Sequence, residues 1–276
     1  NREEFYRKLK FNLEQKNPLI IKMYGGMTLS IDEIYDDYAR LGESLSPHIR
    51  DTHVLLDEAI RRGDRIIMEG AQGSMLDPDY GTYPFVTSSP CVAGSASIGA
   101  GISPTKINSV FGVFKAYTTR VGGGPMVTEL LDKTGEAIRE RAQEYGATTG
   151  RPRRCGWFDG VAGRLSRLVN DFKGITLTRL DVLDIFSELK ICTDYMLDGK
   201  KISTFPCDLS QLQRCKPVYE EFQGWQKPLE GIRLFKDLPL EARRFIKRIE
   251  EVLNCPVYMV SVGPAREQTI EVHSIL

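Results

Sequence analysis

GITLTRLDVLDIFSEL, residues 174–189, is the segment that most directly indicates how the chain folds. Its β-branched and apolar beginning predicts a strand, and the residues that follow predict a helix. The pattern recurs near the C-terminus, where an amphipathic helix within 238–254 precedes a last strand in 256–264. Strands that alternate with helices favour an α/β fold with a largely parallel central sheet flanked by helices.

Residues 1–64 predict a mainly helical segment. Ser30 is followed three residues later by Glu33, which is the capping-box signature of a helix start. The segment 51–64 has helical apolar spacing and a C-cap glycine, Gly63. We therefore expect helices before residue 65, and treat the whole of 1–276 as one truncated catalytic domain whose part 65–276 binds substrate and guanine.

The rest of the chain alternates between strands, loops and helices. RIIMEG, 65–70, predicts a short buried strand, and 70–101 predicts a long loop rich in Gly, Ser, Thr and Pro. A strand is expected within 107–121, and a helix within 129–146 that Gly146 ends. The segment 190–205 predicts a hairpin that turns at Asp198-Gly199, which adds an insertion to the sheet.

Composition excludes several classes of protein. Lysine plus arginine and aspartate plus glutamate both total 37, and this balance argues against binding nucleic acid through a general basic surface. No apolar run reaches the length of a membrane span, and the polar start NREEFYRKLK lacks the apolar core of a signal peptide. The six cysteines form no CxxC motif and predict reduced thiols and a cytoplasmic location. The three histidines lack metal-ligand spacing, so zinc chemistry is not expected.

The loop after the expected strand 65–70 has the composition of a binding loop. EGAQGSMLDPDYGTYPFVTSS, 69–89, combines glycines with uncharged donors and acceptors, among them Gln72 and Thr87. An ordinary surface loop is the alternative. Its length without structure of its own raises the expectation of function.

A second loop concentrates positive charge. GATTGRPRRCGW, 146–157, holds three arginines whose planar forks suit carboxylate or phosphate. Three neighbouring cations repel one another unless an anion arrives, which favours an anion site. A solvated basic turn is the alternative, and RNA is poorly supported because Trp157 is the single aromatic residue of the loop.

Two strand ends suggest a purine pocket. In TRLDVLD, 178–184, the carboxylate of Asp181 is suited to accept hydrogen bonds from N1–H and the exocyclic amine of guanine. An aspartate that caps the following helix is the more frequent explanation. VSVGPAREQT, 260–269, offers backbone groups that suit a base or ribose, although a simple turn is the default reading.

Taken together and in order, these segments resemble the adenylosuccinate synthetase family. The matching stretches run from about residue 65 to the end of the chain: EGAQGSMLDPDYGTYPFVTSS, KAYTTRVGGGP, TEL, ATTGRPRRCGW, TRLDVLD and SVGPAR. The combination is specific, whereas no single loop is. The resemblance implies a P-loop-NTPase-like fold and a homodimer. It also implies the Mg²⁺-dependent ligation of L-aspartate to IMP with GTP as co-substrate, through 6-phosphoryl-IMP, which yields adenylosuccinate, GDP and phosphate.

The resemblance also implies roles for individual residues. It assigns Gln72 to the reacting 6-oxygen of IMP, as the one catalytic contact expected in this chain. The remaining roles fall into three groups: for IMP, Gln72, Thr87, Val121 and Arg151; for L-aspartate, Thr148, Thr149, Arg151 and Arg153; for GTP, Arg153, Arg179, Asp181, Ser261, Val262 and Gly263.

The chain departs from the family pattern at several positions. Arg179 stands where the family usually has lysine, Pro152 replaces a customary basic residue, and Pro90 and Cys91 stand where polar residues are usual. The glycine-rich phosphate loop with its catalytic aspartate and the catalytic histidine find no match here, so the Mg²⁺ ligands are expected outside this chain. Since the chain also starts without methionine, we expect a C-terminal portion that is inactive alone. The alternatives are a non-catalytic nucleotide-binding remnant of the family and an RNA-binding module.

Overall fold

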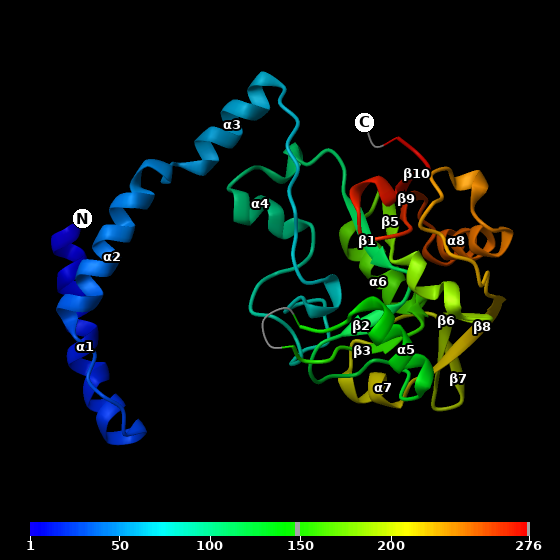
Figure 1. The fold of residues 1–276 in the computed structure, drawn as a ribbon, viewed down its shortest axis with the longest axis horizontal. Helices are drawn as coiled ribbons and strands as arrows, with labels where there is room; N and C mark the ends of the chain where they lie inside the picture. Colours follow the sequence, from blue (N-terminus) through cyan, green and yellow to red (C-terminus); the bar gives the residue numbers. More distant parts are fainter. Residues whose placement is uncertain (147–149, 275–276) are drawn as a thin grey trace. The chain divides into compact units, whose positions relative to one another are not determined.

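A computed structural model describes residues 1–146 and 150–274 of the chain. The chain divides into two compact units, Asn1–Arg65 and Ile66–Leu276. Both units are drawn in Figure 1.

The first unit is helical, as expected for residues 1–64. It contains α1 (Arg2–Tyr24), α2 (Ile31–Leu45), a 3₁₀ turn η1 (Ser46–His48) and α3 (Thr52–Arg62). The Ser30 side chain accepts a hydrogen bond from the Glu33 backbone N–H and begins α2, which confirms the expected cap. Gly63 ends α3 with a φ of 80°, a conformation that favours glycine. The helices α1 and α2 pack through the aromatic rings of Phe5 and Tyr35, whose centroids lie 5.6 Å apart.

The second unit is built on a mostly parallel sheet with strand order β1-β5-β9-β10. The strands β1 (Phe111–Lys115), β5 (Gly174–Thr178) and β9 (Val257–Ser261) run parallel, and β10 (Thr269–Glu271) is antiparallel to β9. Figure 1 shows β1, β5 and β9 side by side. This arrangement confirms the α/β fold with a largely parallel sheet.

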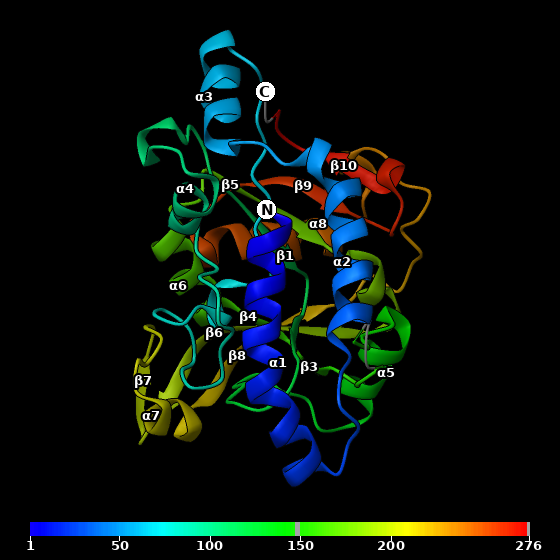
Figure 2. The same ribbon diagram turned by 90° about the vertical axis from the view of Figure 1, so that its left-hand side faces the viewer.

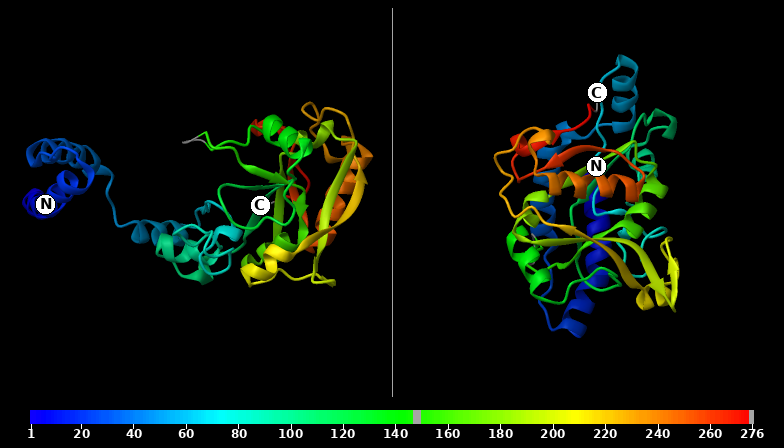
Figure 3. Two further views of the ribbon diagram at one scale, coloured as in Figure 1. Left: turned by 90° about the horizontal axis from the view of Figure 1, so that it is seen from below. Right: turned by 90° about the vertical axis from the view of Figure 1, so that its right-hand side faces the viewer.

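A second sheet carries the expected hairpin. It consists of β4 (Phe158–Asp159), β6 (Glu188–Leu197), β7 (Lys200–Ile202) and β8 (Lys216–Gln223). The β6–β7 hairpin turns at Asp198 and Gly199, which both have positive φ, as predicted. The long antiparallel pair β6–β8 is visible in both panels of Figure 3. A separate short pair joins β2 (Thr118–Arg120) to β3 (Arg154–Gly156).

The second unit also contains helices and 3₁₀ turns. The helices are α4 (Gly94–Ala100), α5 (Lys133–Ala142), α6 (Gly160–Asn170), α7 (Leu209–Arg214) and α8 (Leu240–Leu253), and the 3₁₀ turns are η2 (Ser74–Leu76), η3 (Pro104–Lys106), η4 (Leu180–Ile185), η5 (Phe235–Asp237) and η6 (Arg266–Gln268). The helix α6 packs against β6 and against α8, and α8 also contacts β8. Figure 2 shows α6, α8, β6 and β8 from another side. Buried side chains of β5, β9 and α8, such as Leu177, Val260 and Phe245, form the main core.

Four sequence-based predictions were wrong in detail. Residues 65–70 form no strand in the described structure, and the side chain of Ile67 is 94% exposed. The segment 70–101 contains η2 and α4 and is not a continuous loop. The helix α5 ends at Ala142, where Gln143 adopts the left-handed conformation, four residues before Gly146. The helix expected after β5 is the six-residue 3₁₀ turn η4.

No helix in residues 1–146 or 150–274 is both long and apolar enough to cross a membrane.

Candidate functional site

The parallel strands bring three site segments to one edge of the sheet. Since β1, β5 and β9 run in the same direction, their carboxyl ends, Lys115, Thr178 and Ser261, meet there. Ligands of parallel α/β sheets bind beyond these ends. The expected guanine residues follow β5 and β9 directly, so the topology gathers them as the sequence predicted.

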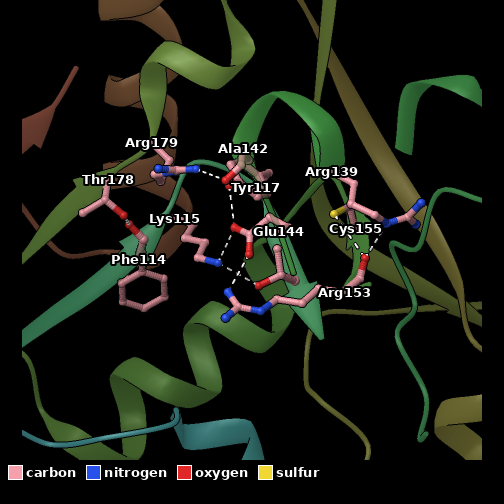
Figure 4. Close-up of polar contacts among 11 residues, drawn as sticks. Phe114, Lys115, Tyr117, Arg139, Ala142, Glu144, Arg153, Cys155, Thr178 and Arg179 are labelled. Atoms are coloured by element: carbon pink, nitrogen blue, oxygen red, sulfur yellow. Dashed lines mark hydrogen bonds and ion pairs between the residues drawn. The ribbon is translucent and has the colours of Figure 1, made fainter. Parts of the chain in front are cut away.

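A buried carboxylate, Glu144, organises this edge. It follows the C-terminus of α5, and its side chain is 3% exposed. The Oε1 atom accepts hydrogen bonds from Lys115 Nζ at 2.5 Å and from the Tyr117 hydroxyl at 2.7 Å. The Oε2 atom accepts one from Arg153 Nη1 at 2.6 Å. Figure 4 shows the carboxylate between the Lys115 and Arg153 side chains.

The charges around Glu144 determine its ionisation. Burial raises the pKa of Glu144, but hydrogen bonds from Lys115 and Tyr117 and the nearby cations outweigh it, so this pKa lies below its ordinary value. Burial also lowers the pKa of Lys115, and Glu144 opposes that change. The pair is therefore a buried ammonium–carboxylate contact at the end of β1, to which Thr119 adds a hydroxyl acceptor 3.0 Å from Lys115 Nζ.

The arginine loop, residues 146–157, starts beside Glu144, and a short antiparallel stem closes it. The Arg153 N–H donates to the Glu144 carbonyl at 2.9 Å, and the Gly146 N–H donates to the Arg151 carbonyl at 2.8 Å. Tyr145 and Pro152 form an antiparallel bridge between these contacts. The stem therefore fixes Arg151 and Arg153 at the base of the loop. Pro152 has no N–H to donate, and its position in the stem needs none.

Two expected aspartate-binding residues, Thr148 and Thr149, lie outside the described residues. Their roles therefore stay predictions.

Arg153 and Arg154 of this loop have carboxylate partners in the protein itself. Arg153 pairs with Glu144, as described above. Arg154 forms a two-point contact with Glu129 and donates to the carbonyls of Gly122 and Gly124. The expectation that the arginines repel one another until an outside anion arrives was therefore wrong for this pair of residues. Arg154 thereby holds the segment 122–124 in place.

The expected guanine residues adopt an unusual local structure. Arg179 has a φ of 65°, a left-handed conformation that is uncommon for a residue with a side chain. Its Nη2 donates to the Ala142 carbonyl (Figure 4), and its Nε is buried without a partner in the described part of the chain. Such conformations cluster at ligand sites because the surrounding structure must hold them in place.

Asp181 does not cap the 3₁₀ turn that contains it. The turn η4 begins at Arg179 without a side-chain cap, so the capping alternative was wrong. Instead, Oδ1 of Asp181 is buried and has no hydrogen-bond partner among the described residues. Burial raises the pKa of this carboxyl. An unsatisfied buried acceptor is costly, and a ligand donor would relieve that cost.

The segment after β9 lies beside η4, because β9 contacts that turn. The Ser261 hydroxyl donates to the Gly263 carbonyl at 2.9 Å. A side chain at Gly263 would collide with Gln268, whose Oε1 atom lies 2.3 Å from the ideal Cβ position. These atoms are the flexible end of the Gln268 side chain, so a larger residue at 263 would displace that side chain and the hydrogen bond that its Oε1 accepts from the Ala265 N–H. Val262 beside it is buried.

The 69–89 loop is ordered by two residues that the sequence analysis did not single out. The buried carboxylate of Asp77 accepts four backbone N–H bonds, from Asp79, Tyr80, Cys91 and Val92. Arg120 of β2 donates to the Thr82 hydroxyl and to the Phe85 carbonyl, each at 2.8 Å. The loop is thus fixed to β2 by side-chain hydrogen bonds.

The expected IMP residues lie on this ordered loop and just after β2. Gln72 has a φ of 60°, and its Oε1 lies 3.9 Å from the Cys91 thiol, which donates to it. The Thr87 N–H donates to the Leu76 carbonyl, and the Thr87 hydroxyl lies 3.4 Å from the Ser89 hydroxyl. Val121 follows β2, and its side chain is half exposed. Cys91, a departure from the family pattern, therefore contacts an expected IMP residue directly.

Hydrogen bonds connect the arginine loop with the expected guanine residues through the end of α5. Ala142 binds Arg179, Glu144 binds Arg153, and Arg141 donates to the Asp181 carbonyl at 3.3 Å. The Gln72 and Thr87 side chains make no hydrogen bond to the arginine loop within the described residues. Among the described residues no group of three or more His, Cys, Asp or Glu is arranged to hold a metal ion.

Comparison with known proteins agrees with this arrangement. The model of the adenylosuccinate synthetase family matches residues 1–270. The chain is 51% identical to the adenylosuccinate synthetases of Dehalococcoides mccartyi and Carboxydothermus hydrogenoformans, over 97% and 98% of its length. The structure of fully ligated adenylosuccinate synthetase from Plasmodium falciparum superposes with a TM-score of 0.91 at 33% identity, over 98% of this chain and 64% of that one.

The chain spans about 63% of the length of these curated relatives. The match to the family model nevertheless covers nearly all of its own residues, and the fold and the order of the loops agree with it. The chain belongs to the adenylosuccinate synthetase family.

Proposed function

We propose that the protein containing this chain ligates L-aspartate to IMP with GTP, and forms adenylosuccinate, GDP and phosphate. The γ-phosphoryl group of GTP is transferred to the 6-oxygen of IMP. The aspartate amine then forms a bond to C6 and displaces phosphate. An amide-like oxygen leaves poorly until it is phosphorylated, and phosphoryl transfer depends mainly on positioning and charge neutralisation.

One observation carries the guanine part of this proposal. The buried Oδ1 of Asp181 has no partner in the described structure, and it stands at the carboxyl end of a parallel strand. Guanine presents two donors on one edge, N1–H and the exocyclic amine, whereas adenine lacks the N1–H. An ionised Asp181 satisfies both donors, and Ser261, Val262 and Gly263 line the same pocket beside Arg179.

The arginine loop receives the anionic substrates in this proposal. Thr148, Thr149, Arg151 and Arg153 bind the carboxylates of L-aspartate, Arg151 also contacts IMP, and Arg153 also contacts GTP. The hairpin stem supports these roles, because it fixes both arginines beside the edge where β1 and β5 end.

Gln72, Thr87 and Val121 bind IMP in the same proposal, with Gln72 at the 6-oxygen. The left-handed conformation of Gln72 supports a ligand role. The hydrogen bonds of Asp77 and Arg120 also support it, because they hold the loop in one shape without using Gln72 or Thr87.

Magnesium, dimerisation and location complete the proposal. Mg²⁺ prefers oxygen ligands, and no cluster of acids in the described residues fits it, so no step is assigned to the metal through this chain. The proposal includes a homodimer and a cytoplasmic location, which the family match and the six cysteines without a CxxC motif support. Binding of nucleic acid is not proposed, because the formal charge is zero.

The activity is proposed for the whole protein, since this chain spans about 63% of its relatives. We expect residues 1–276 alone to bind nucleotide without turnover. The test is to incubate the whole protein, and separately residues 1–276, with IMP, L-aspartate, Mg²⁺ and GTP or ATP, and to measure adenylosuccinate by chromatography. Product with GTP but little with ATP, formed only by the whole protein, is expected. A whole protein that binds nucleotide without forming product would support the non-catalytic alternative.

A further inference from the structure

We propose that Glu144 is a positioning residue that holds the Arg153 guanidinium toward the anionic substrates. Lys115 and Tyr117 fix the other oxygen of the Glu144 carboxylate. The inference rests on the proposed function, and it adds a residue on which the arginine loop depends.

The contacts of Glu144 are divided between its two oxygens. Oε1 accepts from Lys115 and Tyr117, which belong to β1 and to the link after it, and Oε2 accepts from Arg153. The Glu144 carbonyl also accepts the Arg153 N–H at 2.9 Å. Backbone and side chain of one residue therefore fix both the position and the direction of Arg153 relative to the sheet.

The contact with Glu144 leaves part of the Arg153 guanidinium available for a ligand. Glu144 contacts Nη1 of Arg153, and the Arg153 side chain is 32% exposed. The Nε of Arg153 is buried and has no hydrogen-bond partner among the described residues. Arginine carries five N–H donors, so a guanidinium held at one nitrogen retains donors for a carboxylate or phosphate.

The charges also favour an anion at this place. Three cations, Lys115, Arg153 and Arg179, act electrostatically on one another or on Glu144. Two carboxylates oppose these three cations, Glu144 beside Lys115 and Arg153, and Asp181 beside Arg179. The excess positive charge remains for a substrate anion at the carboxyl edge of the sheet.

The chemistry of the three donors makes glutamate necessary. Lysine and arginine carry donors and no acceptor. An amide at position 144 has one acceptor oxygen, so its NH₂ group must face either Lys115 or Arg153, and that contact becomes two opposed donors. Glu144→Gln therefore releases one cation, whereas Glu144→Asp keeps the charge and loses one methylene of reach.

The experiment is a double-mutant cycle in the whole protein, with adenylosuccinate formation measured at varied L-aspartate. The variants are Glu144→Gln, Glu144→Asp, Arg153→Leu and the double variant Glu144→Gln with Arg153→Leu. Glu144→Gln is expected to lower kcat/KM for aspartate about 100-fold, the loss typical of a misplaced positioning group. The double variant should fall no more than about threefold below Arg153→Leu, because Glu144 acts through Arg153. The KM for IMP should change less than threefold.

A matched control separates positioning from general destabilisation. Glu220 also accepts two hydrogen bonds from an arginine, Arg248, but this pair joins β8 to α8 outside the site. Glu220→Gln should leave kcat/KM unchanged. Glu144→Asp, which keeps the buried charge, should retain more activity than Glu144→Gln and serves as the test if the glutamine variant does not fold.

The outcomes are separable. Activity of the parent protein tests the proposed function, and the ratios among variants test the positioning role. Additive losses in the double variant would overturn the inference. So would a Glu144→Gln protein with kcat/KM within threefold of the parent, or equal losses for the aspartate and glutamine variants.

Discussion

Asp77→Asn tests how the 69–89 loop is held, because the aspartate uses both carboxylate oxygens. Oδ1 accepts from the N–H groups of Asp79 at 2.9 Å and Tyr80 at 3.1 Å, and Oδ2 accepts from those of Cys91 at 2.6 Å and Val92 at 3.2 Å. An amide keeps one acceptor oxygen and turns an NH₂ group toward two donors. Two charge-assisted hydrogen bonds are lost, and at about 1.5 kcal/mol each the loop loses about 3 kcal/mol.

Amide hydrogen exchange in the whole protein measures this loss directly. Three kcal/mol corresponds to about a 100-fold faster exchange, expected at Cys91 and Val92 if the amide oxygen stays with Asp79 and Tyr80. Asp208→Asn is the control, since Asp208 caps the exposed helix α7 through Ser210 and Gln211. Because asparagine caps a helix about as well as aspartate, this variant should leave both α7 and the loop nearly unchanged. Unchanged protection throughout the loop in a folded Asp77→Asn protein would refute the reasoning.

The same contacts predict a pH dependence. Burial raises the pKa of Asp77, but the four backbone N–H bonds outweigh it, and the pKa lies below its ordinary value. The ionised carboxylate therefore stabilises the folded loop at pH values above the unfolded pKa, about 4. That stabilisation is lost as the pH falls through the lower folded pKa. In Asp77→Asn the loss with acid should disappear from the exchange profile of Cys91 and Val92.

Three further predictions follow from other contacts. Glu129→Gln breaks the two-point pair with Arg154 and should lower the free energy of unfolding by about 1–3 kcal/mol in urea titrations; an unchanged midpoint and slope would argue against this role. Because burial raises the pKa of Asp181, GTP binding that needs the carboxylate should weaken on acidification at a higher pH than for an ordinary aspartate, and calorimetry with Asp181→Asn should show no such dependence. Gly199 has a φ of 81° in the hairpin turn, so Gly199→Ala should cost about 1 kcal/mol, and a more stable variant would contradict that geometry.

The sequence predicts elements well where the signal is local. The cap at Ser30, the turn at Asp198-Gly199 and the amphipathic helix α8 depend on neighbours within a few residues, and the structure confirms them. RIIMEG shows the limit of this reasoning. Its β-branched residues favour a strand, but a strand also needs a partner, and residues 65–70 pair with none in the described structure.

Helix ends and short turns are harder to predict. The helix α5 ends at Ala142 because Gln143 adopts the left-handed conformation and its N–H binds back to the helix, while glycine was the expected signal. After β5, the segment from Leu180 forms a 3₁₀ turn in which Leu180, Val182 and Leu183 are all buried. Packing on several sides thus replaces the single apolar face of an ordinary helix.

The residues that organise the site depend on contacts that are distant in the sequence. Glu144 binds Lys115, and Arg120 binds Thr82. Asp77 has two local partners, Asp79 and Tyr80, but its contacts with Cys91 and Val92 carry no sequence signal. The resemblance to a family supplied the contact residues, and the three-dimensional structure was required to find the residues that hold them.

The most direct test of the proposed function asks whether Asp181→Asn changes the nucleobase preference of the whole protein. Xanthine differs from guanine by a carbonyl oxygen in place of the exocyclic amine, so it offers an acceptor where guanine offers a donor. Asparagine at this position supplies the matching NH₂ donor. Adenylosuccinate formation by the parent and by Asp181→Asn is measured with GTP and with xanthosine triphosphate. If Asp181 binds the base, the variant loses turnover with GTP and gains it with xanthosine triphosphate. Equal preference for GTP in both proteins would contradict the assignment of Asp181 to the base.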